Sequence, residues 1–243
     1  MLKSIRITDY NIFASSITAI EIIKEHQTII NTINAHSYIV AKNDSNFKKA
    51  LIESDILLPD GEGIVFMAKQ TKGVKIKKIA GADIHQHLVA QAQAHKLKCF
   101  YLGASQETLD IIKGKQEKAY PDIEFQFFSP PFKSKFSIED NHKMIEKVNS
   151  FNPDILFIGM TAPKQEKWVS QNKESINAKV ICSIGAVFDF VAETKRRAPQ
   201  WMINLRMEWL HRALSSWRLT KRYMYSNPLF IWEIIRLKIT RQA

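Results

Sequence analysis

The chain has 243 residues, 45% of them hydrophobic, and a formal net charge of +11 at pH 7. This apolar content is enough to bury a core, so the composition excludes an intrinsically disordered chain. The longest apolar runs, such as 185–192 and 228–232, are far shorter than the roughly 20 residues that cross a bilayer, which excludes a transmembrane helix.

The amino terminus, MLKSIRITD, loses its apolar character too soon for a secretory signal, so we expect a cytoplasmic protein. Cys99 and Cys182 each lie within a short apolar run that is typical of a buried strand. We therefore expect two core thiols, with neither a disulfide nor a metal site.

Short β-rich runs alternate with longer segments of helical spacing along the first 194 residues. The runs predict strands at 38–41, 55–58, 98–102, 124–128, 154–160 and 179–184. The longer segments predict helices at 16–33, 64–69, 84–95, 107–118, 138–148 and 164–175. The alternation predicts a Rossmann-like α/β domain over 1–194, with a mostly parallel sheet and helices on both faces.

Ligands of such sheets bind beyond the carboxyl ends of the strands, so the strand-to-helix junctions are the first candidates for a site. The first junction is LPDGEG, residues 58–63, which places Asp60 and Gly61 between a strand and a helix. Asp60 is either a catalytic base or a helix cap that accepts backbone N–H bonds. A Gly-x-Gly without a third glycine does not indicate a dinucleotide site.

Two further junctions carry cations close to a helix start. Lys78, Gly81 and Asp83 precede the helix predicted at 84–95. After the strand at 154–160, Pro163 is followed by Lys164 and Gln165. Exposed N–H groups at a helix start attract phosphate, so this junction is either an anion site or an ordinary solvated helix start.

A basic, tryptophan-rich segment, 195–243, forms the end of the chain. It holds eleven Lys or Arg and two acidic residues, and therefore carries +9 of the formal +11, together with four of the five tryptophans. We interpret it as a helical appendage that meets an anionic, partly apolar surface, which leaves a membrane and a nucleic acid as alternatives.

Two helical patterns follow one another in this appendage. An apolar stripe predicts a helix over 203–217, with three arginines largely on its opposite side: Arg212, Arg218 and Arg222. This helix either packs its stripe on the domain or docks over a site or a membrane. The stretch 228–239 combines Phe, Trp and Ile with basic residues, which is typical of an interfacial anchor, and a core helix is its alternative.

Taken together, these junctions and the appendage resemble the WecG/TagA/CpsF glycosyltransferases, which build bacterial cell-surface polysaccharides. The resemblance covers most of the chain and is most specific at six motifs: 58–63, 80–83, 163–166, 185–190, 197–199 and 208–212. It implies transfer of a sugar from a UDP-sugar to a polyprenyl-diphosphate-linked sugar, with inversion at the anomeric carbon. An N-acetylhexosamine or a related sugar is the expected donor sugar.

The resemblance also assigns roles to individual residues. Asp60 matches the general base of the family. Nucleotide-sugar binding is expected from a larger set: Asn43, Gly61, Lys78, Gly81, Asp83, Lys164, Gln165 and Asp189. The three appendage arginines are expected at the acceptor diphosphate, because Arg suits phosphate recognition. The chain has no Asp-x-Asp motif of the kind that holds a divalent metal in many glycosyltransferases, so we expect neither a metal nor another cofactor.

Three departures from the family pattern put the identity of the sugar in doubt. Lys78 stands where Arg is usual, Pro130–Phe132 replaces a frequent Gly-Tyr-Phe, and Glu193 replaces a glycine. We expect a peripheral protein on the inner face of the plasma membrane. The rivals are a nucleic-acid-binding protein, which no recognised motif supports, and a soluble sugar-nucleotide enzyme. Self-association stays an open alternative.

Overall fold

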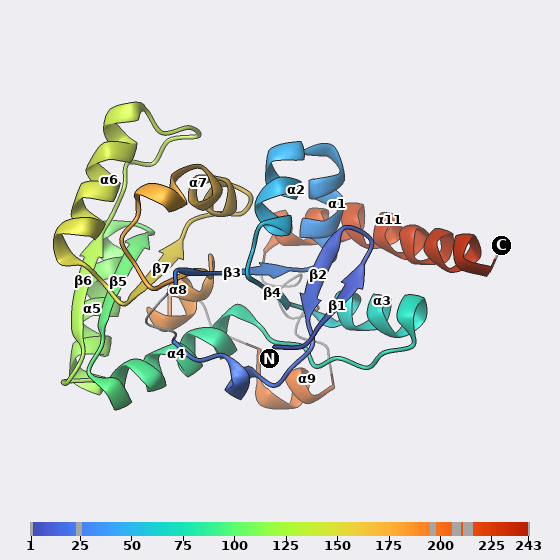
Figure 1. Cartoon of the computed structure of the whole chain (residues 1–243), viewed down its shortest axis with the longest axis horizontal. Coiled ribbons are helices and arrows are strands. Elements are labelled where there is room, and N and C mark those ends of the chain that lie inside the picture. The colour runs from blue at the N-terminus through green and yellow to red at the C-terminus, as the bar shows by residue number, and fades with distance from the viewer. Residues whose placement is uncertain (1, 23–25, 195–197, 206–209, 211–215, 243) are drawn as a thin grey trace.

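The computed structural model describes residues 2–22, 26–194, 198–205, 210 and 216–242 (Figure 1). They form an eight-stranded sheet in the order β1-β2-β4-β3-β8-β7-β5-β6. β1 and β2 pair antiparallel, and all the other neighbouring strands pair parallel. The predicted α/β class with a mostly parallel sheet is therefore confirmed.

The strands are β1 (Ser4–Ile7), β2 (Tyr10–Phe13), β3 (Thr28–Ile33), β4 (Ile56–Pro59), β5 (Lys98–Gly103), β6 (Glu124–Phe128), β7 (Ile155–Gly159) and β8 (Val180–Ser183). The α-helices are α1 (Ala35–Asn43), α2 (Ser45–Ile52), α3 (Glu62–Lys72), α4 (Gly81–His95), α5 (Gln106–Ala119), α6 (Ile138–Phe151), α7 (Lys164–Asn172), α8 (Val187–Val191), α9 (Gln200–Asn204) and α11 (Trp217–Gln242). Short 3-10 turns lie at Ile17–Ala19 and Lys173–Ser175.

Helices cover both faces of the sheet, as expected. Successive side chains of a strand point to opposite faces, and both faces of β5 are buried. Cys99 and Tyr101 face a core shared with α4, α5 and α8, whereas Phe100 and Leu102 face a core shared with α6 and α7. This double burial explains why the central strands are apolar without alternation.

Two elements near the amino terminus differ from the prediction. The predicted helix at 16–33 contains a 3-10 turn and the buried strand β3, and the predicted strand at 38–41 lies inside helix α1. β3 is held between β4 and β8, so long-range pairing decides its conformation. In α1, the Asn34 side chain caps the helix by accepting from the Ser37 N–H at 3.0 Å.

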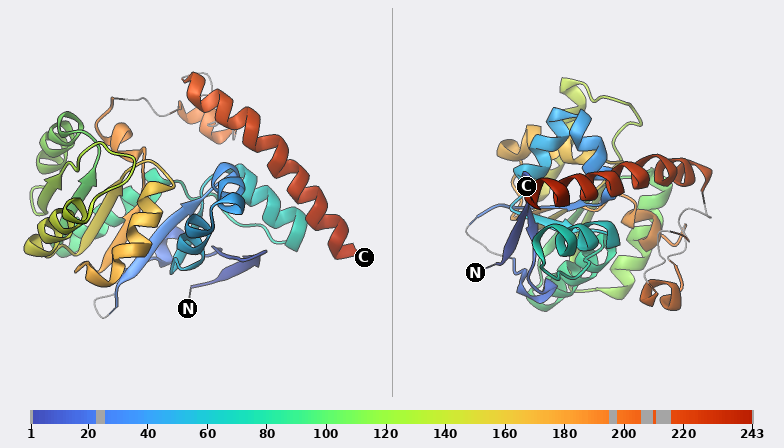
Figure 2. Two further views of the ribbon diagram at one scale, coloured as in Figure 1. Left: turned by 90° about the horizontal axis from the view of Figure 1, so that it is seen from above. Right: turned by 90° about the vertical axis from the view of Figure 1, so that its right-hand side faces the viewer.

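A third core connects the C-terminal helix to the domain. Phe230 and Ile234 of α11 are buried in a cluster with side chains of β2, β4, α1 and α3. Figure 2 shows α11, in red, running beside α1 and α3. The stretch 228–239 is therefore a core helix along one side. The division of the chain at residue 194 stays a prediction.

The helix predicted across 203–217 is wrong, because it is interrupted twice. α9 ends at Asn204, and neither Leu205 nor Ser216 is helical. Met207 and Leu214, which belong to the predicted stripe, lie outside the described residues. Within the part of the chain that is described, no helix is both long and apolar enough to cross a membrane.

Candidate active site

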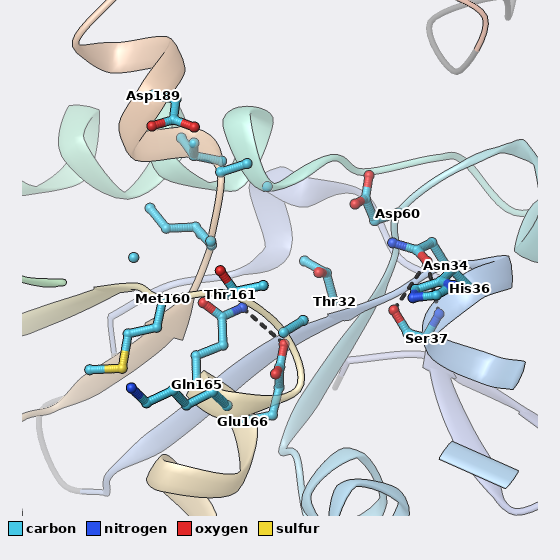
Figure 3. A pocket seen from close by; sticks show the side chains of 18 of the residues that line it. Thr32, Asn34, His36, Ser37, Asp60, Met160, Thr161, Gln165, Glu166 and Asp189 are labelled. Carbon is cyan, nitrogen blue, oxygen red and sulfur yellow. Dashed lines mark hydrogen bonds between the residues drawn. The ribbon is translucent and has the colours of Figure 1, made fainter. Parts of the chain in front are cut away.

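A cavity of about 1360 Å³ lies at one end of the sheet (Figure 3). Residues that directly follow each of the parallel strands β3 to β8 line it, from Asn34 after β3 to Gly185 after β8. This is the carboxyl edge of the sheet, where ligands of doubly wound folds bind. The position predicted for the site is therefore the position of the cavity.

Most of the predicted site residues meet at this cavity, although they come from distant parts of the chain. Those that line it are Asp60, Gly61, Lys78, Gly81, Lys164, Gln165, Asp189 and Arg222. Arg212 lies outside the described residues, and so does the side chain of Arg218. Among the described residues, no group of three or more His, Cys, Asp or Glu side chains is placed to hold a metal ion.

Asp60 lies at the turn between β4 and α3. Its backbone N–H donates to the Ile33 carbonyl at 2.9 Å, which ties the end of β4 to β3. The N-cap of α3 is Gly61, at φ +117°, a conformation that favours glycine. The residue at the N-cap is thus Gly61, one position after Asp60, and the half-buried side chain of Asp60 lines the cavity.

Two predicted residues do not line the cavity. Asp83 instead closes the start of α4, because its carboxylate accepts from the Ala80 N–H at 2.9 Å. Asn43 is exposed at the last position of α1. Asn34, nine residues earlier, lines the cavity instead, as does Asn227 of α11, and the prediction missed Asn34 because β3 was taken for part of a helix.

Lys164 is tied to the loop that follows β6. Its ammonium group donates to the Lys133 carbonyl and lies 3.5 Å from the ring centroid of Phe136. Burial lowers the pKa of Lys164. A cation is thereby held at the cavity wall next to an aromatic ring.

A buried carboxylate, Glu166, lies beside Gln165 in the first turn of α7. It is 2% exposed, and the Gln165 side-chain amide donates to it at 2.9 Å. Burial raises the pKa of Glu166 to about 7, against the opposing effects of its hydrogen bonds and of the Arg222 charge. The motif at 163–166 contains this residue, but only the tertiary structure reveals that it is buried at the cavity.

The C-terminal helix α11 contributes to the same cavity through Arg222 and Tyr223. His36 of α1 lies on the cavity wall, and burial together with the Arg222 charge lowers its pKa to about 4. His36 is therefore neutral at neutral pH. Figure 3 shows His36, Asn34 and Asp60 grouped on one side of the cavity, with Gln165 and Glu166 on another.

Glycines let the backbone come close to the cavity floor. A Cβ at position 159 would lie 2.3 Å from the Phe188 ring, so Phe188 packs directly on the end of β7. Gly185 has a φ of +52°, and a Cβ added to it would lie 3.5 Å from the Gln165 side-chain amide. The cationic side chains and the backbone next to the cavity suit a phosphorylated ligand, and the carboxylate suits a reacting hydroxyl group.

Comparisons with known proteins indicate the same kind of chemistry. Residues 3–243 match the family described as "Glycosyl transferase WecG/TagA/CpsF family". A relative from Bacillus subtilis (strain 168), an N-acetylglucosaminyldiphosphoundecaprenol N-acetyl-beta-D-mannosaminyltransferase, is 28% identical over 86% of this chain and 79% of its own length. A protein with the same description from Staphylococcus aureus (strain MRSA252) is 29% identical over 88% of this chain and 74% of its own length.

Proposed function

Since the chain belongs to the WecG/TagA/CpsF family of glycosyltransferases, we propose that it transfers an N-acetylhexosamine from a UDP-sugar to a polyprenyl-diphosphate-linked sugar. The names of its relatives favour N-acetylmannosamine as the transferred sugar and N-acetylglucosamine as the acceptor sugar. The observation that carries the proposal is the meeting of Asp60, Gln165, Asp189 and Arg222 at one cavity on the carboxyl edge of the sheet.

Asp60 acts as the general base. It takes the proton from the acceptor hydroxyl while that oxygen attacks the anomeric carbon, and the bond from that carbon to the UDP oxygen breaks on the opposite face. The product therefore has the inverted configuration. An alcohol is a poor nucleophile at neutral pH, and a positioned base contributes about 100-fold or more.

The departing UDP leaves as an anion and needs positive charge or N–H donors. Lys78 and Lys164 line the cavity, together with the amino-terminal turns of α4 and α7. Such groups stabilise a developing negative charge without a metal. We therefore expect turnover to be unchanged by a chelator, and loss of activity with EDTA that returns with added Mg²⁺ or Mn²⁺ would contradict this.

The acceptor diphosphate is assigned to the arginines of the appendage. Arg222 supports this assignment, because it lines the cavity and its charge acts on both His36 and Glu166. A guanidinium group binds phosphate oxygens with two parallel hydrogen bonds. Arg212 and Arg218 keep the same proposed role without support from the described side chains.

A membrane surface is the proposed docking partner of α11. Its outer side carries large apolar side chains, all exposed: Trp217, Met224, Tyr225, Ile231, Trp232, Ile235 and Ile239. Lys221 and Lys238 stand among them, and their charge suits anionic headgroups. Burying this side in the outer part of the bilayer would bring the cavity next to a lipid-linked acceptor, as a peripheral protein requires.

The transfer reaction tests the proposal directly. The purified protein is incubated with a panel of UDP-N-acetylhexosamines and a short-chain polyprenyl-diphosphate N-acetylglucosamine, and the disaccharide lipid is measured. We expect one donor to be used in strong preference to the others. Equal turnover on a water-soluble sugar would favour the soluble sugar-nucleotide enzyme, and no turnover with any donor would reject the proposal.

The nucleic-acid alternative is tested with the same preparation. Binding to vesicles that contain anionic lipid is compared with binding to DNA and RNA at equal ionic strength. We expect vesicle binding to dominate. Tight nucleic-acid binding without vesicle binding would assign the basic appendage to the rival function.

A further inference from the structure

Glu166 and Gln165 present two hydrogen-bond acceptors that nothing in the described structure satisfies. Both side chains are at least 97% buried, being 2% and 3% exposed, and both line the cavity. Glu166 Oε1 accepts from Gln165 Nε2 at 2.9 Å. Glu166 Oε2 and Gln165 Oε1 have no hydrogen-bond partner among the described residues. Unsatisfied buried acceptors are unfavourable, so a ligand that supplies donors would relieve both.

The carboxylate decides which end of the Gln165 amide is available. An ionised carboxylate only accepts hydrogen bonds, so the amide must direct its NH2 group toward Glu166 and leave its carbonyl oxygen for other partners. Once protonated, Glu166 can donate to that carbonyl oxygen instead. The amide would then rotate and present NH2, a donor, at the position where an acceptor had been.

The charged groups around Glu166 come from two helices. Arg222 of α11 and Lys167 of α7 both favour its ionised form, whereas burial opposes ionisation more strongly and raises its pKa to about 7. Lys167 also pairs with Asp44, before α2, at 2.8 Å. The other ionisable residues on the cavity wall are His36, Asp60, Glu62, Lys78, Lys133, Lys164, Asp189 and Tyr223.

We propose that Glu166 is a positioning residue for the donor sugar: its carboxylate fixes the Gln165 amide, so that Gln165 Oε1 accepts a hydrogen bond from a hydroxyl or acetamido N–H group of that sugar. This rests on the proposed function, because it assumes a UDP-sugar in the cavity. It assigns discrimination between a nucleotide and its sugar conjugate to two side chains in the first turn of α7.

Binding measurements test this without requiring turnover. Affinities for UDP and for the preferred UDP-sugar are measured by calorimetry at pH 8 for the wild type and for Glu166→Gln, which keeps the shape but removes the charge. We expect Glu166→Gln to weaken UDP-sugar binding by about 10- to 100-fold, as for loss of a hydrogen bond to a charged group, and to leave UDP binding within a few-fold of wild type. Glu124→Gln, on the exposed edge strand β6, is the matched control and should change neither.

The pH profile separates positioning from a structural role. Wild-type kcat/KM for the UDP-sugar should fall below about pH 7 as Glu166 gains a proton, and Glu166→Gln should lack this decline. If Glu166 acts through Gln165, the double variant with Gln165→Ala should be no worse than Gln165→Ala alone. Additive losses, or a Glu166→Gln enzyme with wild-type UDP-sugar affinity and the same decline, would overturn the inference.

A folding defect in Glu166→Gln would not leave the question open. Gln165→Ala keeps the carboxylate, and its own kcat/KM should lose the decline near pH 7; a retained decline would reject the coupling. Failure of the proposed function has a different outcome, because the wild type itself would then bind no UDP or transfer no sugar.

Discussion

Phe230 of α11 packs edge to face on Tyr38 of α1, with ring centroids 5.4 Å apart and ring planes at 82°. The two residues are 192 positions apart in the chain, and both are buried. Tyr38 also lies edge to face with Tyr10 of β2. The C-terminal helix is therefore part of the core that the first strands build.

Replacing Phe230 with Ala should destabilise the protein by about 3–5 kcal/mol, because it removes a buried aromatic ring from a packed cluster. Trp232→Ala, two residues away on the exposed side, should change stability by less than about 0.5 kcal/mol. Urea unfolding of both variants checks this. Equal losses would mean that the two sides of α11 are not distinguished as the burial pattern indicates.

The exposed side of α11 should carry the membrane affinity. Replacing Trp232 and Ile235 together with Ser should weaken binding to anionic vesicles by at least about 10-fold, since each large apolar side chain contributes about 1.5–3 kcal/mol when fully buried. Vesicle co-sedimentation measures the change. Ile138→Ser, at an exposed position of α6, is the control, and an equal loss there would speak against a specific docking side.

Asp60→Asn should retain UDP affinity and lose transfer by at least about 100-fold, because the amide cannot take the proton of the acceptor hydroxyl. Calorimetry and the disaccharide-lipid assay measure the two properties separately. Asp110→Asn, exposed on α5, should behave as wild type. Turnover of Asp60→Asn near the wild-type rate would remove Asp60 from the mechanism.

Gly159→Ala should destabilise the protein by about 1–3 kcal/mol and reduce transfer. The new methyl group would lie 2.3 Å from Phe188, which must move, and Phe188 lines the cavity. Gly114→Ala is the opposite case, because nothing lies within 4 Å of its Cβ and the position is inside α5. That control should gain about 0.4–1 kcal/mol, and thermal unfolding compares the two.

Glu166→Gln should be more stable than the wild type at pH 8 and equally stable near pH 4. The pKa of Glu166 is raised from 4.5 to about 7, so the folded state binds the proton more tightly than the unfolded chain. The stability that the neutral carboxyl contributes is fully present below pH 4.5 and is lost as pH rises through about 7. Melting curves at pH 4, 6 and 8 should show this widening difference, at about 2–4 °C for each kcal/mol. A difference that does not depend on pH would contradict the assignment.

The strands from β4 to β8 could be predicted because local pattern and tertiary position agree there. β4, β5, β7 and β8 are short apolar runs buried on both faces, so their sequences report their place directly, whereas β6 is a partly exposed edge strand. The segment Thr28–Ile33 shows the limit. Its apolar residues also fit a helical spacing, and only pairing with β4 and β8 makes it a strand.

The residues of the candidate site also divide into those that local sequence predicts and those that depend on the tertiary structure. Asp60, Lys164 and Gln165 were predicted from junctions that are local in sequence, and the cavity brings them together. Asn34 was missed because the strand before it was missed. Glu193 is a smaller case: the family resemblance leads us to expect glycine there, and its φ of +57° is the left-handed conformation that glycine adopts most easily.

The sequence by itself determined the fold class, the edge of the sheet that carries the cavity, and the family, because these depend on short motifs and on their order along the chain. Only the tertiary structure decided that α11 is buried on one side, that Arg222 reaches the cavity and that Glu166 is enclosed there. Burial and electrostatic coupling between distant residues depend on which elements pack together, and no local pattern of residues contains that information.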